Sequence, residues 1–249
     1  MSEGTARAPR EERPAFYALA PGGWRDYWSL LHPPYTLWHL SYVVFGAATA
    51  PAVDLGWLAE TLVAFFLALG IAAHALDELR GRPLRTQIPG SVLVGLAVIG
   101  LAGAVALGVH GALEVSPWLS AFIAVGGFLV VAYNLELLGG RFHSDTWFAL
   151  AWGGFPVLTG AFAQGGRLGA ASVLVAGGCV ALSIAQRRLS TPVRMLRRRV
   201  EGVEGRLRLR DGTERPLSAN DLRDAPERAL RALSVAVPLL ALGVLVARL

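Results

Sequence analysis

Apolar residues run through most of this 249-residue chain in long, nearly unbroken segments. A helix needs about 20 consecutive apolar residues to cross a bilayer. Segments near this length, the first and last of them shorter, predict membrane-spanning helices. They cover residues 35–50, 57–76, 91–109, 117–135, 146–163, 168–185 and 232–246. The expected fold class is therefore an all-α membrane protein with about seven transmembrane helices.

Polar segments divide the rest of the chain. Residues 1–22 are rich in proline, arginine and glutamate, which predicts a disordered N-terminal segment, and residues 23–200 then form the transmembrane bundle. Within 201–219, leucine and arginine alternate up to Asp211 and Gly212, a pattern that predicts a small cytoplasmic β-hairpin insertion. Residues 220–249 are expected to form an amphipathic entry followed by the last transmembrane helix.

Charge sets the expected orientation. Only 16% of residues are charged, against about 25% in soluble domains. The arginines gather in alternate loops, at 80–85, at 141 and from 187 to 231, which by the positive-inside rule places the N-terminus and these loops in the cytoplasm. They would contact anionic membrane lipids there. Nucleic acid is not an expected partner, because no aromatic residues are interleaved with the arginines of the hairpin.

The second apolar segment ends in a cluster of polar residues. His74, Asp77 and Glu78 lie three and four residues apart, so a helix places them on one face, and Arg80 and Arg82 follow. Carboxylates at this depth are costly unless they face water, a metal ion or another polar group. One interpretation makes Asp77 and Glu78 catalytic, with His74 as a further metal ligand. The other makes them a solvated helix end paired with arginine, and His74 a buried histidine bonded to a neighbouring helix.

Two more polar clusters are expected on the same side of the membrane. Arginine suits phosphate and carboxylate suits Mg²⁺ that accompanies a substrate phosphate. The candidate phosphate-binding residues are Arg80, Arg82, Arg141, Arg187, Arg188, Arg194, Tyr133 and Asn134. Alternatives stay open here: the arginines can serve topology and anionic lipids alone, and Tyr133 and Asn134 can bond between helices.

The order of these motifs resembles the UbiA-type superfamily of intramembrane prenyltransferases over about residues 25–200. In the family, an Asn-Asp-x-x-Asp-x-x-x-Asp motif ends the second helix and a basic Arg-Pro stretch follows. Here Asp77 takes the central position and Gly81-Arg-Pro-Leu-Arg-Thr-Gln-Ile-Pro89 follows. Ala73 and Gly81 stand where the outer Asn and Asp would be, and residues 186–194 lack the family's second carboxylate motif. Asp221 and Asp224 are candidates for that motif, displaced by the hairpin.

The resemblance implies a UbiA-like bundle and a Mg²⁺-dependent prenyltransferase acting on a prenyl diphosphate. Asp77, Glu78, Asp221 and Asp224 would then hold metal, and an acceptor would attack the allylic cation left by ionisation. An alternative is a catalytically inactive UbiA-like protein that binds an isoprenoid lipid, or a partner protein through the hairpin. A third is a small lipid or solute transporter. The sequence names neither the acceptor nor the length of the donor.

Overall fold

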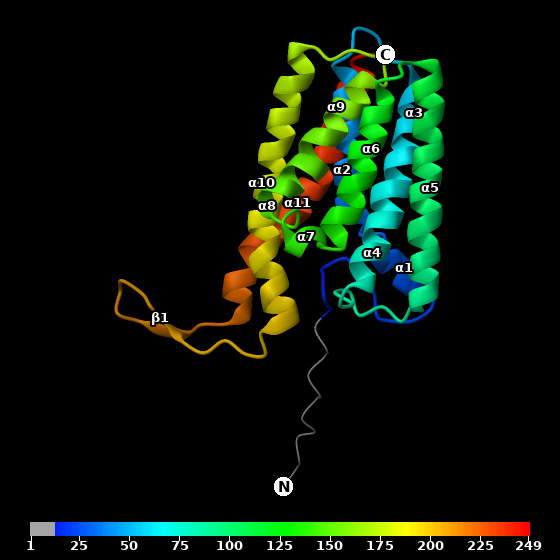
Figure 1. The fold of residues 1–249 in the computed structure, drawn as a ribbon. Coiled ribbons are helices and arrows are strands. Elements are labelled where there is room, and N and C mark those ends of the chain that lie inside the picture. The colour runs from blue at the N-terminus through cyan, green and yellow to red at the C-terminus, as the bar shows by residue number, and fades with distance from the viewer. Residues whose placement is uncertain (1–12) are drawn as a thin grey trace.

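The computed structural model of this protein describes residues 13–249, and the first twelve residues of the predicted disordered segment lie outside them. The described chain is mostly helical. Its long helices run side by side in one bundle, with a hairpin projecting sideways from the end of α10 (Figure 1). Residues 13–22, which the sequence also assigned to the disordered segment, lie against the bundle: Arg197 and Arg198 donate hydrogen bonds to the carbonyl oxygens of Arg13 and Pro14.

Each segment predicted to span the membrane is helical. Two of the helices each contain a π-helical segment. One continuous helix consists of α3, η1 and α4, and another consists of α8, η2 and α9. The elements are α1 (Trp24–Leu30), α2 (Pro33–Ala48), α3 (Leu55–Phe65), η1 (Phe66–Ala73), α4 (His74–Leu79), α5 (Gly90–Glu114), α6 (Leu119–Asn134), α7 (Leu137–Gly140), α8 (Asp145–Ala149), η2 (Leu150–Gly154), α9 (Phe155–Phe162), α10 (Ala170–Arg199) and α11 (Ala219–Val246).

Four of these helices are long and apolar enough to cross a membrane: Leu55–Leu79, Gly90–Glu114, Ala170–Arg199 and Ala219–Val246. They indicate a multi-pass membrane protein. The helices α2 and α6 have 16 residues each and so rise only about 24 Å, less than a hydrocarbon core of about 30 Å. The count of seven spans and the direction of insertion therefore stay predictions.

Glycine lets α2 and α9 approach until their backbones touch. A Cβ atom on Gly46 would overlap the carbonyl oxygen of Val157, and one on Gly160 would overlap that of Val43. Small residues at such crossings are the usual means by which membrane helices pack closely. This contact joins the first and fifth predicted spans.

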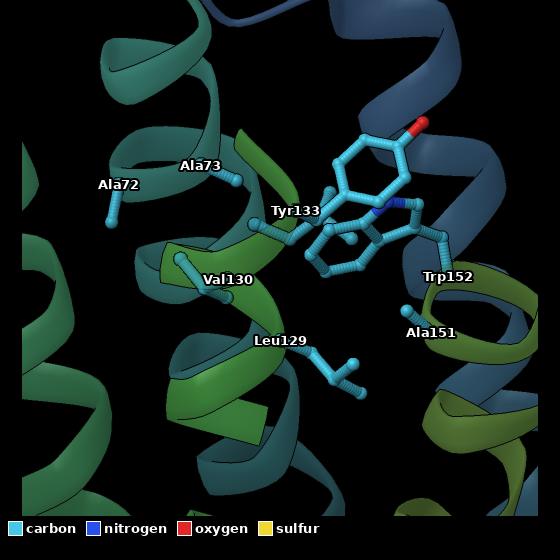
Figure 2. Close-up of a cluster of buried hydrophobic side chains, with 8 residues drawn as sticks. Ala72, Ala73, Leu129, Val130, Tyr133, Ala151 and Trp152 are labelled. Carbon is cyan, nitrogen blue, oxygen red and sulfur yellow. The ribbon is translucent and has the colours of Figure 1, made fainter. Parts of the chain in front are cut away.

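The two π-helical segments face the same part of the core. A buried cluster joins η1, α6 and η2, and Figure 2 shows Tyr133 and Trp152 lying against each other within it, with ring centroids 5.7 Å apart. A π-helical turn interrupts the regular ladder of backbone hydrogen bonds and often occurs at functional sites. Both segments contribute backbone oxygens to the site described below.

The predicted hairpin is confirmed. Strand β1 (Arg206–Arg208) pairs antiparallel with β2 (Glu214–Pro216), and Arg208 lies opposite Glu214. In the turn, the Asp211 carboxylate accepts hydrogen bonds from the backbone N–H and the hydroxyl of Thr213, which lower the pKa of Asp211. Gly212 there has a φ of 86°, which suits glycine.

Candidate functional site

A cavity of about 310 Å³ lies at one end of the bundle, lined by residues of α2, α4, α6, α8 and the second half of α10. Most of its lining is polar. We call it the polar chamber and define it by these lining residues: Tyr17, His32, His39, His74, Asp77, Arg80, Tyr133, Asn134, Glu136, His143, Gln186, Arg187, Ser190, Arg194, Arg198 and Arg199. A polar cavity in a membrane bundle is costly to keep, which makes this the default binding site.

Three charged side chains of the polar chamber, those of Asp77, Arg194 and Arg199, make no hydrogen bond or ion pair within residues 13–249. Arg199 is exposed, whereas Asp77 and Arg194 are partly buried. Other charges there are paired: Arg80 lies 2.8 Å from Glu136, and Arg187 lies 2.8 Å from Asp145. An uncompensated charge away from bulk water is unfavourable unless a ligand or water answers it. Asp77 and Arg194 therefore offer one anionic and one cationic contact to an occupant.

Four of the five histidines in the chain line the polar chamber. Three are held by a backbone carbonyl through Nδ1: His39 by Trp152 at 2.8 Å, His74 by Gly70 at 3.1 Å, and His143 by Tyr133 at 3.0 Å. A carbonyl oxygen only accepts, so Nδ1 carries the proton in each ring. Gly70 and Trp152 belong to η1 and η2, so both π-helical segments fix a histidine of this chamber.

The fourth histidine is held by the N-terminal segment. His32 Nδ1 lies 3.0 Å from the Tyr17 hydroxyl, and its ring stacks on that of His74 with centroids 4.2 Å apart. Burial, with the neighbouring His74 and Arg198, lowers the pKa of His32 well below its ordinary value. Burial raises the pKa of Tyr17. His32 is therefore a neutral ring at physiological pH, and Tyr17 keeps its hydroxyl proton.

An apolar groove adjoins the polar chamber. It encloses about 110 Å³ between α3, η1, α5, α6, η2 and α9, and Leu69 and Trp152 line both spaces. We define the apolar groove by its principal side chains, which are Phe65, Leu101, Phe122, Ile123, Leu129 and Phe155. Polar and apolar spaces in contact through shared residues suit a molecule with a polar head and an apolar tail.

The structure brings together seven of the residues selected from the sequence. Those lining the polar chamber are His74, Asp77, Arg80, Tyr133, Asn134, Arg187 and Arg194. Those that do not line it are Glu78, Arg82, Arg141, Arg188, Asp221 and Asp224. Asn134 also donates a hydrogen bond to the Val130 carbonyl in its own helix.

Glu78 lies away from the chamber, and this corrects its expected pairing with Asp77. Its side chain is 1% exposed, and its two oxygens accept hydrogen bonds from the Leu84 N–H at 3.0 Å and from the N–H and hydroxyl of Thr86, both at 2.9 Å. Arg82 donates to the Ile88 carbonyl at 2.6 Å. Both residues thus hold the 80–89 loop, and both oxygens of Glu78 are occupied there.

The expected second carboxylate motif is also elsewhere. Asp221 caps the start of α11 through Ser218, at 2.7 Å, and lies 2.8 Å from Arg215, while Asp224 pairs with Arg228. Arg141 and Arg188 are exposed. In the described part of the chain, no three His, Cys, Asp or Glu side chains are arranged to hold a metal ion. A Mg²⁺ site built from two carboxylate motifs does not fit these residues.

Sequence reasoning left several chamber residues out, chiefly Tyr17, His32, His39 and Gln186, and counted His143 in a polar cluster without giving it a role. One signal was present. His32 precedes the first apolar segment, His74 ends the second and His143 precedes the fifth, so alternating helices place all three at the same end of the bundle. Tyr17 had no such signal, because nothing in residues 13–22 predicts where that segment packs.

Comparison with known proteins finds no match to this chain among family models, curated proteins or solved structures.

Proposed function

We propose that this membrane protein binds an isoprenoid lipid phosphate, with its head in the polar chamber and its tail in the apolar groove, and transfers its prenyl group to an acceptor. The observation that supports this most directly is the unpaired guanidinium of Arg194 in a chamber that shares the lining residues Leu69 and Trp152 with an apolar groove. The resemblance of the 77–89 region to UbiA-type enzymes supplies the reaction. The positive-inside rule puts the chamber on the cytoplasmic side.

The charge of the polar chamber favours an anionic head. Five arginines line it against two carboxylates, Asp77 and Glu136, and Glu136 is already paired with Arg80. Arginine contacts phosphate through two parallel N–H donors, so a few of these side chains suffice to hold a phosphate or diphosphate. Arg187, Arg194 and Arg198 are seven and four residues apart on α10, so they share one face of this helix and present their charge along one side of the chamber.

These arginines would also carry the chemistry. When the bond between the prenyl carbon and its diphosphate oxygen breaks, negative charge grows on the leaving diphosphate. Fixed guanidinium groups away from bulk water stabilise that charge strongly. Asp77 is the unpaired carboxylate of the chamber and can accept the proton that the acceptor loses when it attacks the allylic carbon. The aromatic rings of Trp152 and Phe148 border the space in which that cation would form.

A second candidate is a protein that binds the same lipid without turning it over. The absence of a three-ligand metal group among residues 13–249 favours it, because the resemblance implies two carboxylate motifs. In this case Arg194 would still bind the phosphate, and Asp77 would accept a hydrogen bond from the ligand or from a water molecule.

Lipid copurification tests the shared part of both candidates. The purified wild-type chain is expected to carry a lipid phosphate detectable by native mass spectrometry, and Arg194→Ala is expected to lose it. Arg188→Ala is the matched control, because Arg188 lies on the same helix but is exposed and outside the chamber. Equal lipid occupancy in Arg194→Ala and the control would contradict the proposal.

Turnover separates the two candidates. With radiolabelled prenyl diphosphates of several lengths, a transferase releases diphosphate in the wild type and loses this activity in Asp77→Asn while retaining the lipid. A binder shows lipid occupancy in both proteins and no release of diphosphate in either.

A further inference from the structure

Three histidines of the polar chamber, His39, His74 and His143, offer hydrogen-bond acceptors to it, and we call this group the histidine wall. In His39, His74 and His143, Nδ1 is used by a backbone carbonyl, so in the neutral ring Nε2 carries the free lone pair. Within the described residues none of these Nε2 atoms has a partner. None of them is sealed from open space either, because the fully buried unpartnered side-chain atoms are those of Gln164 and Gln186. Since all three rings line the chamber, we take the free nitrogens to face it.

Gln186 adds an independent sign of the same kind. Its side chain is 3% exposed, lines the polar chamber, and has a carbonyl oxygen, Oε1, with no hydrogen-bond partner among residues 13–249. Buried polar atoms are nearly always satisfied by protein, water or ligand, and an orphaned one costs about 1–3 kcal/mol. Asp77 is a further acceptor without a partner. The chamber therefore presents several acceptors that its own residues leave unsatisfied.

The arginine donors of α10 and the histidine acceptors lie on different elements, and Gln186 is an acceptor on α10 itself. The guanidinium groups of Arg187, Arg194 and Arg198 all come from α10, whereas the histidines come from α2, α4 and the loop before α8. A bare phosphate or diphosphate offers acceptors alone, so it satisfies the arginines and leaves the histidines unanswered. Adding a proton to the rings instead would place more positive charge beside five arginines.

We propose that the occupant of the polar chamber carries hydroxyl groups beside its anionic group, and that His39, His74 and His143 select it by accepting hydrogen bonds from those hydroxyls. This inference rests on the proposed function and names the chemistry of the ligand head. The hydroxyls belong either to the head of the lipid itself, as in a sugar phosphate, or to a separate polyol acceptor bound beside the lipid phosphate.

Two lipids with the same tail test the selection: a polyprenyl phosphate and the corresponding polyprenyl phosphohexose, each titrated into the full-length protein in nanodiscs. Two or three added hydrogen bonds give a preference of roughly fivefold or more for the phosphohexose. A third arm adds free hexose to protein saturated with the bare polyprenyl phosphate. Saturable binding of hexose there identifies a separate acceptor as the source of the hydroxyls, and supports the inference equally.

Histidine variants decide whether the wall is responsible. The double variant His74→Leu/His143→Leu is expected to lose the preference and to retain affinity for the bare phosphate, and His74→Gln is expected to keep part of it because the amide oxygen still accepts. His110→Leu is the matched control, since this fifth histidine pairs with Glu60 and does not line the chamber. Thermal unfolding of each variant in the same nanodiscs confirms that it is folded before binding is compared.

Failure has two distinguishable forms. If both lipids bind equally and free hexose does not bind, or if the preference survives in the double variant, the histidine wall does not select the ligand and the proposed function stands. If neither lipid binds the wild-type protein, both the inference and the proposed function are wrong.

Discussion

Replacement of Glu78 separates a structural carboxylate from a catalytic one. The sequence places Glu78 beside Asp77 as a second acid, but the structure uses both of its oxygens to hold the 80–89 loop. In Glu78→Ala, the Leu84 N–H and the Thr86 N–H and hydroxyl lose their acceptor, and both residues are buried. Leaving three buried donors unsatisfied costs about 3 kcal/mol or more. That is a large share of the free energy of unfolding of an ordinary protein.

Glu78→Gln has a smaller expected effect. The amide oxygen can still accept from Thr86, and only the Leu84 N–H then meets an amide nitrogen instead of an oxygen. The loss is about 1–2 kcal/mol for this one donor. For a chain of this size, it lowers the melting temperature by about 2–8 °C, and Glu78→Ala lowers it by about 6 °C or more. Lipid binding by the folded fraction of Glu78→Gln should equal that of the wild type.

The assay is thermal unfolding in detergent micelles, paired with lipid occupancy measured on the folded fraction. Thr86→Val provides a double-mutant cycle, because it removes one of the three donors. It should destabilise the wild type but have almost no effect in the Glu78→Ala background. A Glu78→Gln protein that melts like the wild type but no longer binds lipid would refute the structural assignment and return Glu78 to the site.

Three further predictions follow from the packing, the N-terminal segment and the helix cap. Gly160→Ala forces a Cβ into the Val43 carbonyl and should sharply lower the melting temperature, whereas Gly177→Ala, where a Cβ meets open space, should not. His32 stays neutral in the folded protein, so below about pH 6.5 the unfolded chain binds more protons than the folded one. The free energy of unfolding therefore falls as the pH drops, by at most about 1.4 kcal/mol per pH unit. This fall should be smaller in His32→Phe. Asp221→Ala should lower stability through the lost cap while lipid occupancy stays unchanged, and a loss of lipid would restore its predicted ligand role.

Helix positions could be predicted because a membrane-spanning helix satisfies its backbone internally and needs only an apolar run of sufficient length. The hairpin could be predicted because leucine–arginine alternation ends at Asp211 and Gly212, where a turn needs a positive φ. The side of the bundle that holds the site also followed from the sequence. His74, Arg80 and Arg187 lie at the ends of apolar segments that topology brings together, and all three line the polar chamber.

Which face of each helix turns toward the chamber could not be predicted. Asp77 and Glu78 are neighbours, and consecutive residues on a helix point about 100° apart. The sequence argument placed His74, Asp77 and Glu78 on one face, and all three do lie in the regular helix α4, but Asp77 and Glu78 stand at opposite edges of that face. His74 and Asp77 line the chamber, and Glu78 faces the loop instead. Tyr17 lines the chamber although it belongs to a segment whose composition predicts disorder.

Among the charged residues of this chain, the presence or absence of hydrogen-bond partners distinguishes candidate ligand contacts from residues that stabilise the fold. Glu78 and Asp221 were plausible ligand contacts, yet the carboxylate of Glu78 accepts hydrogen bonds from a loop and that of Asp221 accepts them at a helix end. Asp77 and Arg194 line one cavity and remain apart, although an ion pair between them would lower the cost of both charges. A chain that keeps two such charges separate in a membrane bundle forgoes stability at that position. A ligand that carries both a hydrogen-bond donor and an anionic group, bound between Asp77 and Arg194, would compensate both charges.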